Sequence, residues 1–126
     1  MSIKTPTKSV RGLGSAKSGV GHFWHQRVTA IALVPLVVWF VASLVAMAGA
    51  DYAQVRDYFA HPLVAVLTIL LLLTGFYHMR LGVQVIIEDY IHAEGTKLAL
   101  LLLTTFSAVA LGLASVFSVL KISLGA

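Results

Sequence analysis

His78 is the first candidate for chemistry in this sequence, because it is an ionisable side chain in an apolar run, Pro62 to Ile87, that only His78 and Arg80 interrupt. The run is long enough to cross a bilayer, where an ionisable group is costly and therefore indicates a function. A neutral imidazole can bind a haem iron through one ring nitrogen. The alternative is a histidine that only forms a hydrogen bond with a neighbouring membrane helix. A single histidine leaves both interpretations open.

Two glycines lie on the same helical face as His78. Successive helical residues are about 100° apart, which places Gly82 about 40° and Gly75 about 60° from the histidine. Glycines allow a broad, flat group such as a porphyrin to approach the backbone closely. They equally allow two membrane helices to pack closely, so the glycines are compatible with either interpretation.

Arg80, two residues beyond His78, lies about 160° from it around the helix and does not point toward the same ligand. We expect its side chain to extend along the apolar surface to the membrane interface. Pairing with a haem propionate or an anionic lipid is the alternative. Gln84 is a further hydrogen-bonding group in this half of the run, to which the sequence assigns no partner.

Polar residues are dense where this run ends, at Glu88, Asp89, Tyr90, His92 and Glu94. A tyrosine is common at a membrane interface. A phenol beside a carboxylate can also donate a hydrogen bond to a quinone carbonyl and connect it to water. A second polar group precedes the first apolar run and consists of His22, Trp24, His25 and Arg27. These side chains are either interfacial anchors or walls of the same pocket.

The elements that must position these side chains are membrane helices. Of the 126 residues, 59% are hydrophobic, 11% are charged and none is cysteine, and the mean hydropathy is +0.92. A soluble domain of this size could not bury so much apolar surface, and a disulfide scaffold or thiolate metal site is excluded. Three apolar runs, residues 28–50, 62–87 and 98–120, are each long enough to cross the hydrocarbon layer as a helix. We predict an all-α membrane protein with a basic tail (1–21) and a three-helix anchor (22–126).

The basic residues predict that the N-terminus is cytoplasmic. Those that precede the first apolar run, without any acidic residue, are Lys4, Lys8, Arg11, Lys17 and Arg27. Basic residues collect on the cytoplasmic side of membranes, and the opposite side would carry only Arg56 and Lys121. The net charge of +4 is therefore a topology signal and does not indicate nucleic-acid binding. A basic, serine-rich tail is also typical of an organelle transit peptide, but we favour a cytoplasmic tail.

His78 is the only histidine within a predicted span. A haem with two axial histidines therefore cannot be completed by one copy of this chain. Three helices with small faces also form a poor closed bundle. The second ligand must therefore come from another subunit or a second copy, and we expect the chain to be part of a complex; the second anchor subunit with which it would pack follows from the resemblance described next.

Two segments together resemble a known family. Residues 78–90, HMRLGVQVIIEDY, have the form H-x10-D-Y, and residues 21–33, GHFWHQRVTAIAL, contain R-V-T-A. In a chain of three spans these motifs resemble the D-type hydrophobic membrane-anchor subunit of succinate dehydrogenase (complex II), in its alphaproteobacterial form. The resemblance extends from about Gly19 to the end of the chain.

The resemblance implies a division of labour. In that family a flavoprotein subunit oxidises succinate, an iron–sulfur subunit carries the electrons, and two three-helix anchors hold haem b and complete a ubiquinone site. His78 would be an axial ligand of the haem iron, and the other, cytochrome b-type anchor would supply the second histidine. Tyr90 would bind a quinone carbonyl with Asp89 beside it. Arg27 would lie near the haem propionates and the quinone pocket.

The expected function is therefore that of a membrane anchor of succinate:ubiquinone oxidoreductase, which is not catalytic alone. We expect it in a bacterial inner membrane in preference to the mitochondrial one, in contact with lipid and its partner subunits. One alternative is an anchor of fumarate reductase. The other is a non-redox membrane protein such as a transporter subunit, in which His78 and Arg80 would relay protons or ions.

Overall fold

The computed structural model describes residues 5–10, 12 and 19–125, and the regular structure within them is entirely helical. The helices are α1 (Pro6–Val10), α2 (Gly19–Ala46), α3 (Tyr52–Ala60), α4 (Pro62–Tyr90) and α5 (Glu94–Ser123). Three of them, α2, α4 and α5, are long and apolar enough to cross a membrane. The predicted all-α membrane protein with three spans is confirmed. Residues 1–4, 11 and 13–18 of the predicted basic tail lie outside the described residues.

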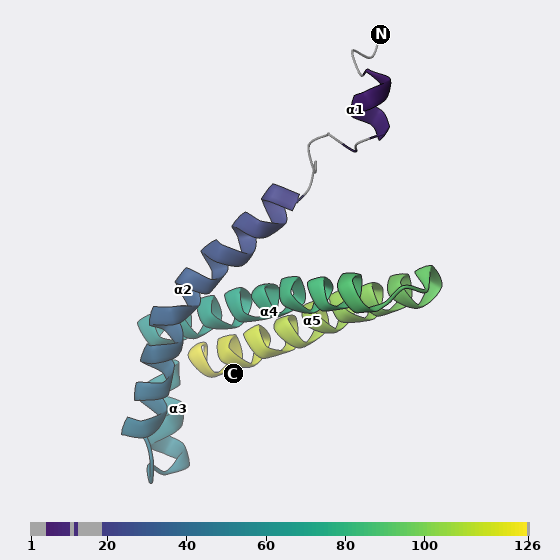
Figure 1. Ribbon diagram of the computed structural model, residues 1–126. Helices are drawn as coiled ribbons and strands as arrows, with labels where there is room; N and C mark the ends of the chain where they lie inside the picture. Colours follow the sequence, from purple (N-terminus) through teal and green to yellow (C-terminus); the bar gives the residue numbers. More distant parts are fainter. Residues whose placement is uncertain (1–4, 11, 13–18, 126) are drawn as a thin grey trace.

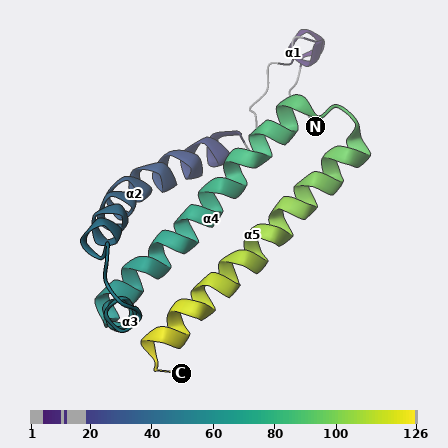
Figure 2. The same cartoon turned by 90° about the horizontal axis from the view of Figure 1, so that it is seen from below.

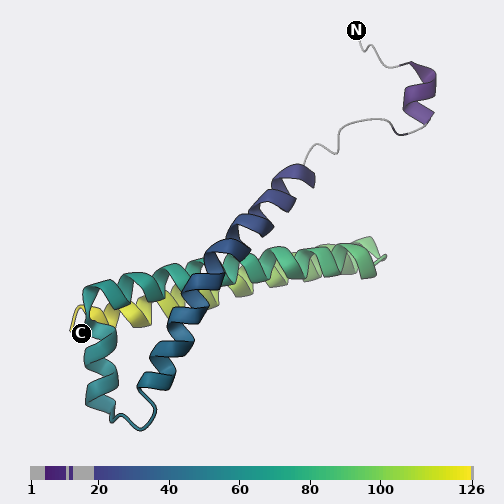
Figure 3. The same cartoon turned by 60° about the vertical axis from the view of Figure 1, so that its left-hand side comes forward.

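Helix α4 lies between the other two long helices and packs against both, whereas α2 and α5 do not pack against each other. Figure 2 shows α4 and α5 side by side and antiparallel, with α2 on the opposite flank of α4. Figures 1 and 3 show that α2 crosses α4 obliquely. The beginning of α2 and the α4–α5 turn lie toward one end of the molecule, and α3 and the C-terminus lie toward the other. The three long helices therefore form an open arrangement.

The observed helices differ from the predicted apolar runs mainly at α2. This helix begins at Gly19, nine residues before the predicted span over 28–50, and ends at Ala46. Polar residues can continue a helix, so hydropathy marks where the hydrocarbon begins and not where the helix begins. Gly49 lies beyond the helix end with φ of 87°, in the left-handed region that glycine adopts at low cost. Helix α4 begins at Pro62 as predicted, with proline in its first turn.

The connection between the first two spans contains a helix that hydropathy did not indicate, α3. Asp51 precedes it and accepts a hydrogen bond from the backbone N–H of Gln54, at 2.8 Å. The Gln54 side chain accepts one from the Asp51 N–H, at 3.0 Å, which completes a capping box. The hydroxyls of Tyr58 and Ser43 lie 2.7 Å apart and join α3 to α2. The connection is thus an ordered element at one end of the molecule.

Few side chains are buried within this chain alone. The buried apolar residues are Ala65, Leu81, Ile87, Ala108 and Val119, and most valines, leucines and phenylalanines of the long helices are exposed. Such a surface suits a lipid environment or partner chains. The α4–α5 contact is close at Gly112, where a Cβ atom would lie 3.5 Å from the Phe76 ring.

This packing predicts that two substitutions of Gly112 differ in their effect on stability. A Cβ at 3.5 Å from Phe76 is in ordinary contact, so Gly112→Ala should leave stability nearly unchanged. Gly112→Leu adds atoms where Phe76 already lies and should lower the free energy of unfolding by about 1–3 kcal/mol through overpacking. Denaturation of the purified protein by titration with a harsh detergent measures both variants. Equal stability of wild type and Gly112→Leu would show that α4 and α5 are not packed in this register.

Candidate functional site

The imidazole of His78 is half-buried and faces α2. Its Nδ1 lies 2.9 Å from the Thr29 hydroxyl oxygen, and its Nε2 lies 3.5 Å from the side-chain nitrogen of Gln26. Gly82 and Gly75 lie on the same face of α4, where added Cβ atoms would come within 3.6 Å of Gln26 and 4.0 Å of Leu33. In this chain the two glycines therefore allow close packing of α2 on α4, one of the two interpretations their spacing permitted.

A polar cavity of about 880 Å³ lies beside this contact, between the first turns of α2 and the second half of α4. Among the side chains that line it are His22, His25, Gln26 and Arg27 from α2 and Tyr77, Arg80, Gln84 and Glu88 from α4. Two side chains of this set each have one buried atom without a hydrogen-bond partner among the described residues. The atoms are Nε2 of His22 and Oε1 of Gln26.

The cations at this cavity have different surroundings. The Arg27 guanidinium lies 4.7 Å from the ring centroid of Phe23, a cation–π contact within the first turns of α2. Arg80 is half-buried and donates from Nε to the Thr105 hydroxyl on α5, at 3.3 Å. We expected Arg80 to extend along the apolar surface to the interface; in the structure its Nε has an acceptor on the neighbouring helix, the Thr105 hydroxyl. Gln84 donates to Glu88, at 2.8 Å.

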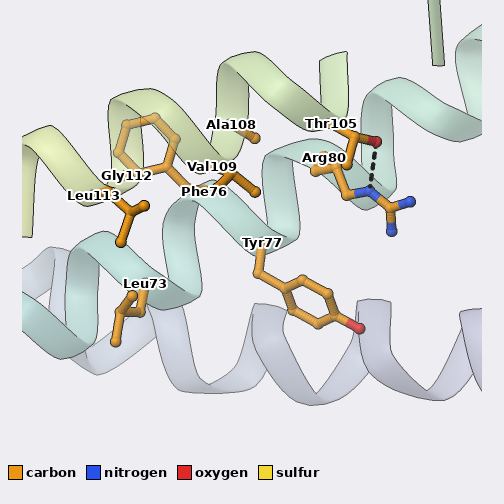
Figure 4. Close-up of a pocket in the computed structure, with 9 residues that line it drawn as sticks. All are labelled: Leu73, Phe76, Tyr77, Arg80, Thr105, Ala108, Val109, Gly112 and Leu113. Atoms are coloured by element: carbon orange, nitrogen blue, oxygen red, sulfur yellow. Dashed lines mark hydrogen bonds between the residues drawn. The ribbon is translucent and has the colours of Figure 1, made fainter. Parts of the chain in front are cut away.

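Arg80 also closes one end of a separate apolar cavity of about 280 Å³ between α4 and α5. Figure 4 shows Leu73 and Leu113 at the opposite end and the Arg80–Thr105 hydrogen bond at this one. The arginine therefore contacts both the polar cavity beside α2 and this apolar cavity beside α5.

Asp89 and Tyr90 lie at the end of α4, outside these cavities. Both side chains are exposed, and that of Tyr90 is 74% exposed. The polar cavity ends at Glu88, so the structure does not bring Tyr90 together with Arg27 inside this chain. The tyrosine and its neighbouring carboxylate remain accessible to a ligand or to another subunit.

Sequence reasoning missed three residues of this site. Thr29 contacts the His78 ring, Gln26 lies at its other nitrogen, and Tyr77 accepts or donates a hydrogen bond at 2.7 Å to Nδ1 of His25. Thr29 stands in the R-V-T-A motif, but the motif by itself assigned it no partner. The position of the Thr29 hydroxyl within an apolar run was the signal that could have indicated a polar partner on another helix.

The donors on this chain suit a metal that is held only partly by it. Within the described parts of the chain, no three His, Cys, Asp or Glu side chains come together as a metal site would require. His78 is a single imidazole donor in a membrane span, with Nδ1 in a short contact and Nε2 in a long one. A haem iron fits this set, because the porphyrin supplies four nitrogens and the protein only axial ligands.

Comparisons with known proteins agree with each other. The family described as succinate dehydrogenase/fumarate reductase transmembrane subunit matches residues 1–112. The succinate dehydrogenase hydrophobic membrane anchor subunit of Paracoccus denitrificans is 33% identical over 122 residues, 97% of this chain and 94% of the relative. That of Rickettsia bellii is 34% identical over 92 residues, 73% of this chain and 74% of the relative. The succinate dehydrogenase membrane anchor subunit of Reclinomonas americana is 30% identical over 96 residues.

The His25–Tyr77 contact should stabilise the packing of α2 on α4. In a double-mutant cycle of His25→Phe and Tyr77→Phe, we expect a coupling energy of about 0.5–1.5 kcal/mol, as for one hydrogen bond. Detergent-induced unfolding of the four proteins gives this energy. Tyr52→Phe is the control because Tyr52 is 81% exposed and lies on α3. A coupling of zero would mean that the two side chains do not interact.

Proposed function

The chain belongs to the family of succinate dehydrogenase/fumarate reductase transmembrane subunits, and we propose that it is the membrane-anchor subunit of a succinate:ubiquinone oxidoreductase. The observation that carries this proposal is the family match over residues 1–112, which includes the intramembrane histidine and the H-x10-D-Y segment. The chain would not catalyse a reaction alone. It would attach a flavoprotein and an iron–sulfur subunit to the membrane and help to pass electrons to the quinone.

In this proposal His78 is an axial ligand of haem b. Haem b, when bound, supplies a one-electron carrier within the membrane. His78 would hold the iron through Nε2, the nitrogen whose contact within this chain is long, 3.5 Å to Gln26. The second axial histidine would come from the other anchor subunit, because His78 is the only histidine of this sequence within the predicted spans, residues 28–50, 62–87 and 98–120. Arg27, at the polar cavity, carries a charge suited to a propionate or to the quinone pocket.

Asp89 and Tyr90 would contribute to the ubiquinone site. Tyr90 lies twelve residues beyond His78 on α4, which places it about 18 Å farther along the helix axis. Its hydroxyl can donate a hydrogen bond to a quinone carbonyl, and the neighbouring Asp89 can orient it and connect it to water. The exposure of both side chains supports a pocket that other subunits complete.

The same layout supports a location and an orientation. We propose a bacterial inner membrane, because the family relatives in Paracoccus and Rickettsia are bacterial proteins. An N-terminus in the cytoplasm would place the beginning of α2 and the end of α4 on the cytoplasmic side. The iron–sulfur subunit would then dock where Tyr90 lies. The relatives named here are succinate dehydrogenase subunits, which favours succinate oxidation over fumarate reduction and over a transporter.

The haem ligand is tested with the intact complex. A tagged wild-type chain, purified in mild detergent, should bring with it a flavoprotein, an iron–sulfur protein and a second three-helix anchor, with the absorption spectrum of a b-type haem. His78→Ala removes a haem ligand and should strongly lower the haem content of the complex. The loss should exceed that from removing a group that only supports a ligand, which lowers metal affinity by about 10–100-fold. His92→Ala is the matched control, since His92 is exposed in the turn after α4.

Two outcomes would contradict this assignment. An unchanged haem spectrum in His78→Ala would show that another residue binds the iron. A wild-type chain that purifies alone and without haem would contradict the anchor function itself.

The quinone residue is tested separately. Tyr90→Phe removes the phenol proton and should lower quinone reduction by about tenfold, as for one hydrogen bond of about 1.4 kcal/mol. Succinate oxidation with a soluble artificial acceptor should stay at the wild-type rate, because that reaction bypasses the anchor. Tyr52→Phe, on α3 at the opposite end of the molecule, should change neither rate. Equal losses in both assays would mean that Tyr90 serves assembly and not the quinone.

A further inference from the structure

Thr29 presents a single hydroxyl proton to three neighbouring groups. Its oxygen lies 2.7 Å from the carbonyl oxygen of His25, 3.1 Å from that of Gln26 and 2.9 Å from Nδ1 of His78. The two carbonyls can only accept hydrogen bonds. If the hydroxyl donated to Nδ1 instead, two oxygens 2.7 Å apart would face each other without a proton between them. The hydroxyl proton therefore belongs to the α2 carbonyls, and a lone pair faces His78.

This arrangement determines the tautomer of His78. Since the Thr29 oxygen accepts, Nδ1 of the imidazole must carry the N–H and donate it. A neutral imidazole has one N–H, so Nε2 keeps its lone pair. The neighbour of Nε2 is the Gln26 amide nitrogen at 3.5 Å, at the long limit of a hydrogen bond. The Gln26 oxygen is buried without a partner, so this amide is not held strongly in place.

We propose that Thr29 is a positioning residue for the haem: it holds the proton of His78 on Nδ1 and directs the lone pair of Nε2 toward the iron. The inference rests on the proposed role of His78 as the axial ligand. Metal-bound histidines commonly donate their second N–H to an acceptor that orients the ring and raises its basicity. Here that acceptor comes from a different helix, α2, so the orientation of the ring depends on how α2 crosses α4.

A threonine suits this task for two reasons. Its β-branched side chain has few rotamers, and the hydrogen bond to the α2 backbone selects one of them. The acceptor oxygen is thus fixed before a ligand arrives. Valine has nearly the same shape but no acceptor, and serine keeps the acceptor, so the two substitutions separate the hydroxyl from the packing.

The test uses the purified complex with Thr29→Val, Thr29→Ser and wild type. Thr29→Val should release haem to an excess of apomyoglobin about 10–100-fold faster and should shift the electron paramagnetic resonance signal of the ferric haem. Thr29→Ser should restore the wild-type signal and a release rate near that of wild type. Thr68→Val is the matched control: Thr68 is buried in α4, and its hydroxyl donates to the Val64 carbonyl.

Each outcome decides the inference. If His78→Ala loses haem but Thr29→Val keeps the wild-type release rate and signal, the inference is overturned. It is also overturned if Thr68→Val has the same effects as Thr29→Val. Retention of haem by His78→Ala would instead overturn the proposed ligand and this inference with it. If Thr29→Val does not assemble, Thr29→Ala takes its place, since its side chain is smaller and cannot clash.

Discussion

Hydrocarbon offers no hydrogen bonds, so every polar side chain within a span must find its partner in protein. Several of them return to their own helix: Thr68 donates to the Val64 carbonyl, and Ser115 and Ser118 likewise donate to carbonyls one turn earlier. Two ionisable side chains in α4, His78 and Arg80, do not. His78 takes its partner from α2 and Arg80 takes its partner from α5. The residues capable of chemistry are thus also the residues that connect the middle helix to both neighbours.

The open arrangement of the long helices follows from the central position of α4. Because α2 and α5 pack against α4 but not against each other, much of their apolar surface is exposed. Lipid can cover some of this surface, and the proposed partner anchor can cover more. The polar cavity lies on the α2 side of α4 and the apolar cavity on the α5 side, with Arg80 at both. A chain of this kind is suited to share a site with another chain.

Hydropathy predicted the three spans well because a helix that crosses the hydrocarbon layer needs about 20 consecutive apolar residues, and this sequence has three such runs. It could not find the beginning of α2, where His22, His25, Gln26 and Arg27 are polar yet helical. Helical spacing correctly placed His78 and both glycines on one face, but its partner Thr29 lies 49 residues earlier. That pairing depends on the angle between two helices, which no local pattern encodes. Asp89 and Tyr90 have exposed side chains, so their proposed role depends on neighbours outside this chain, which no pattern in the sequence encodes.

The two nitrogens of the His78 ring differ in how easily their neighbours can be exchanged. Nδ1 makes a short contact of 2.9 Å with the Thr29 hydroxyl. Nε2 makes a long contact of 3.5 Å with the amide of Gln26, whose oxygen has no hydrogen-bond partner among the described residues. The rotational freedom of the imidazole is therefore lost when α2 and α4 pack, and not when a ligand binds. Ligand exchange at Nε2 then requires little reorganisation of the ring. A group bound at Nε2 would therefore meet a ring that the packing of α2 on α4 has already oriented.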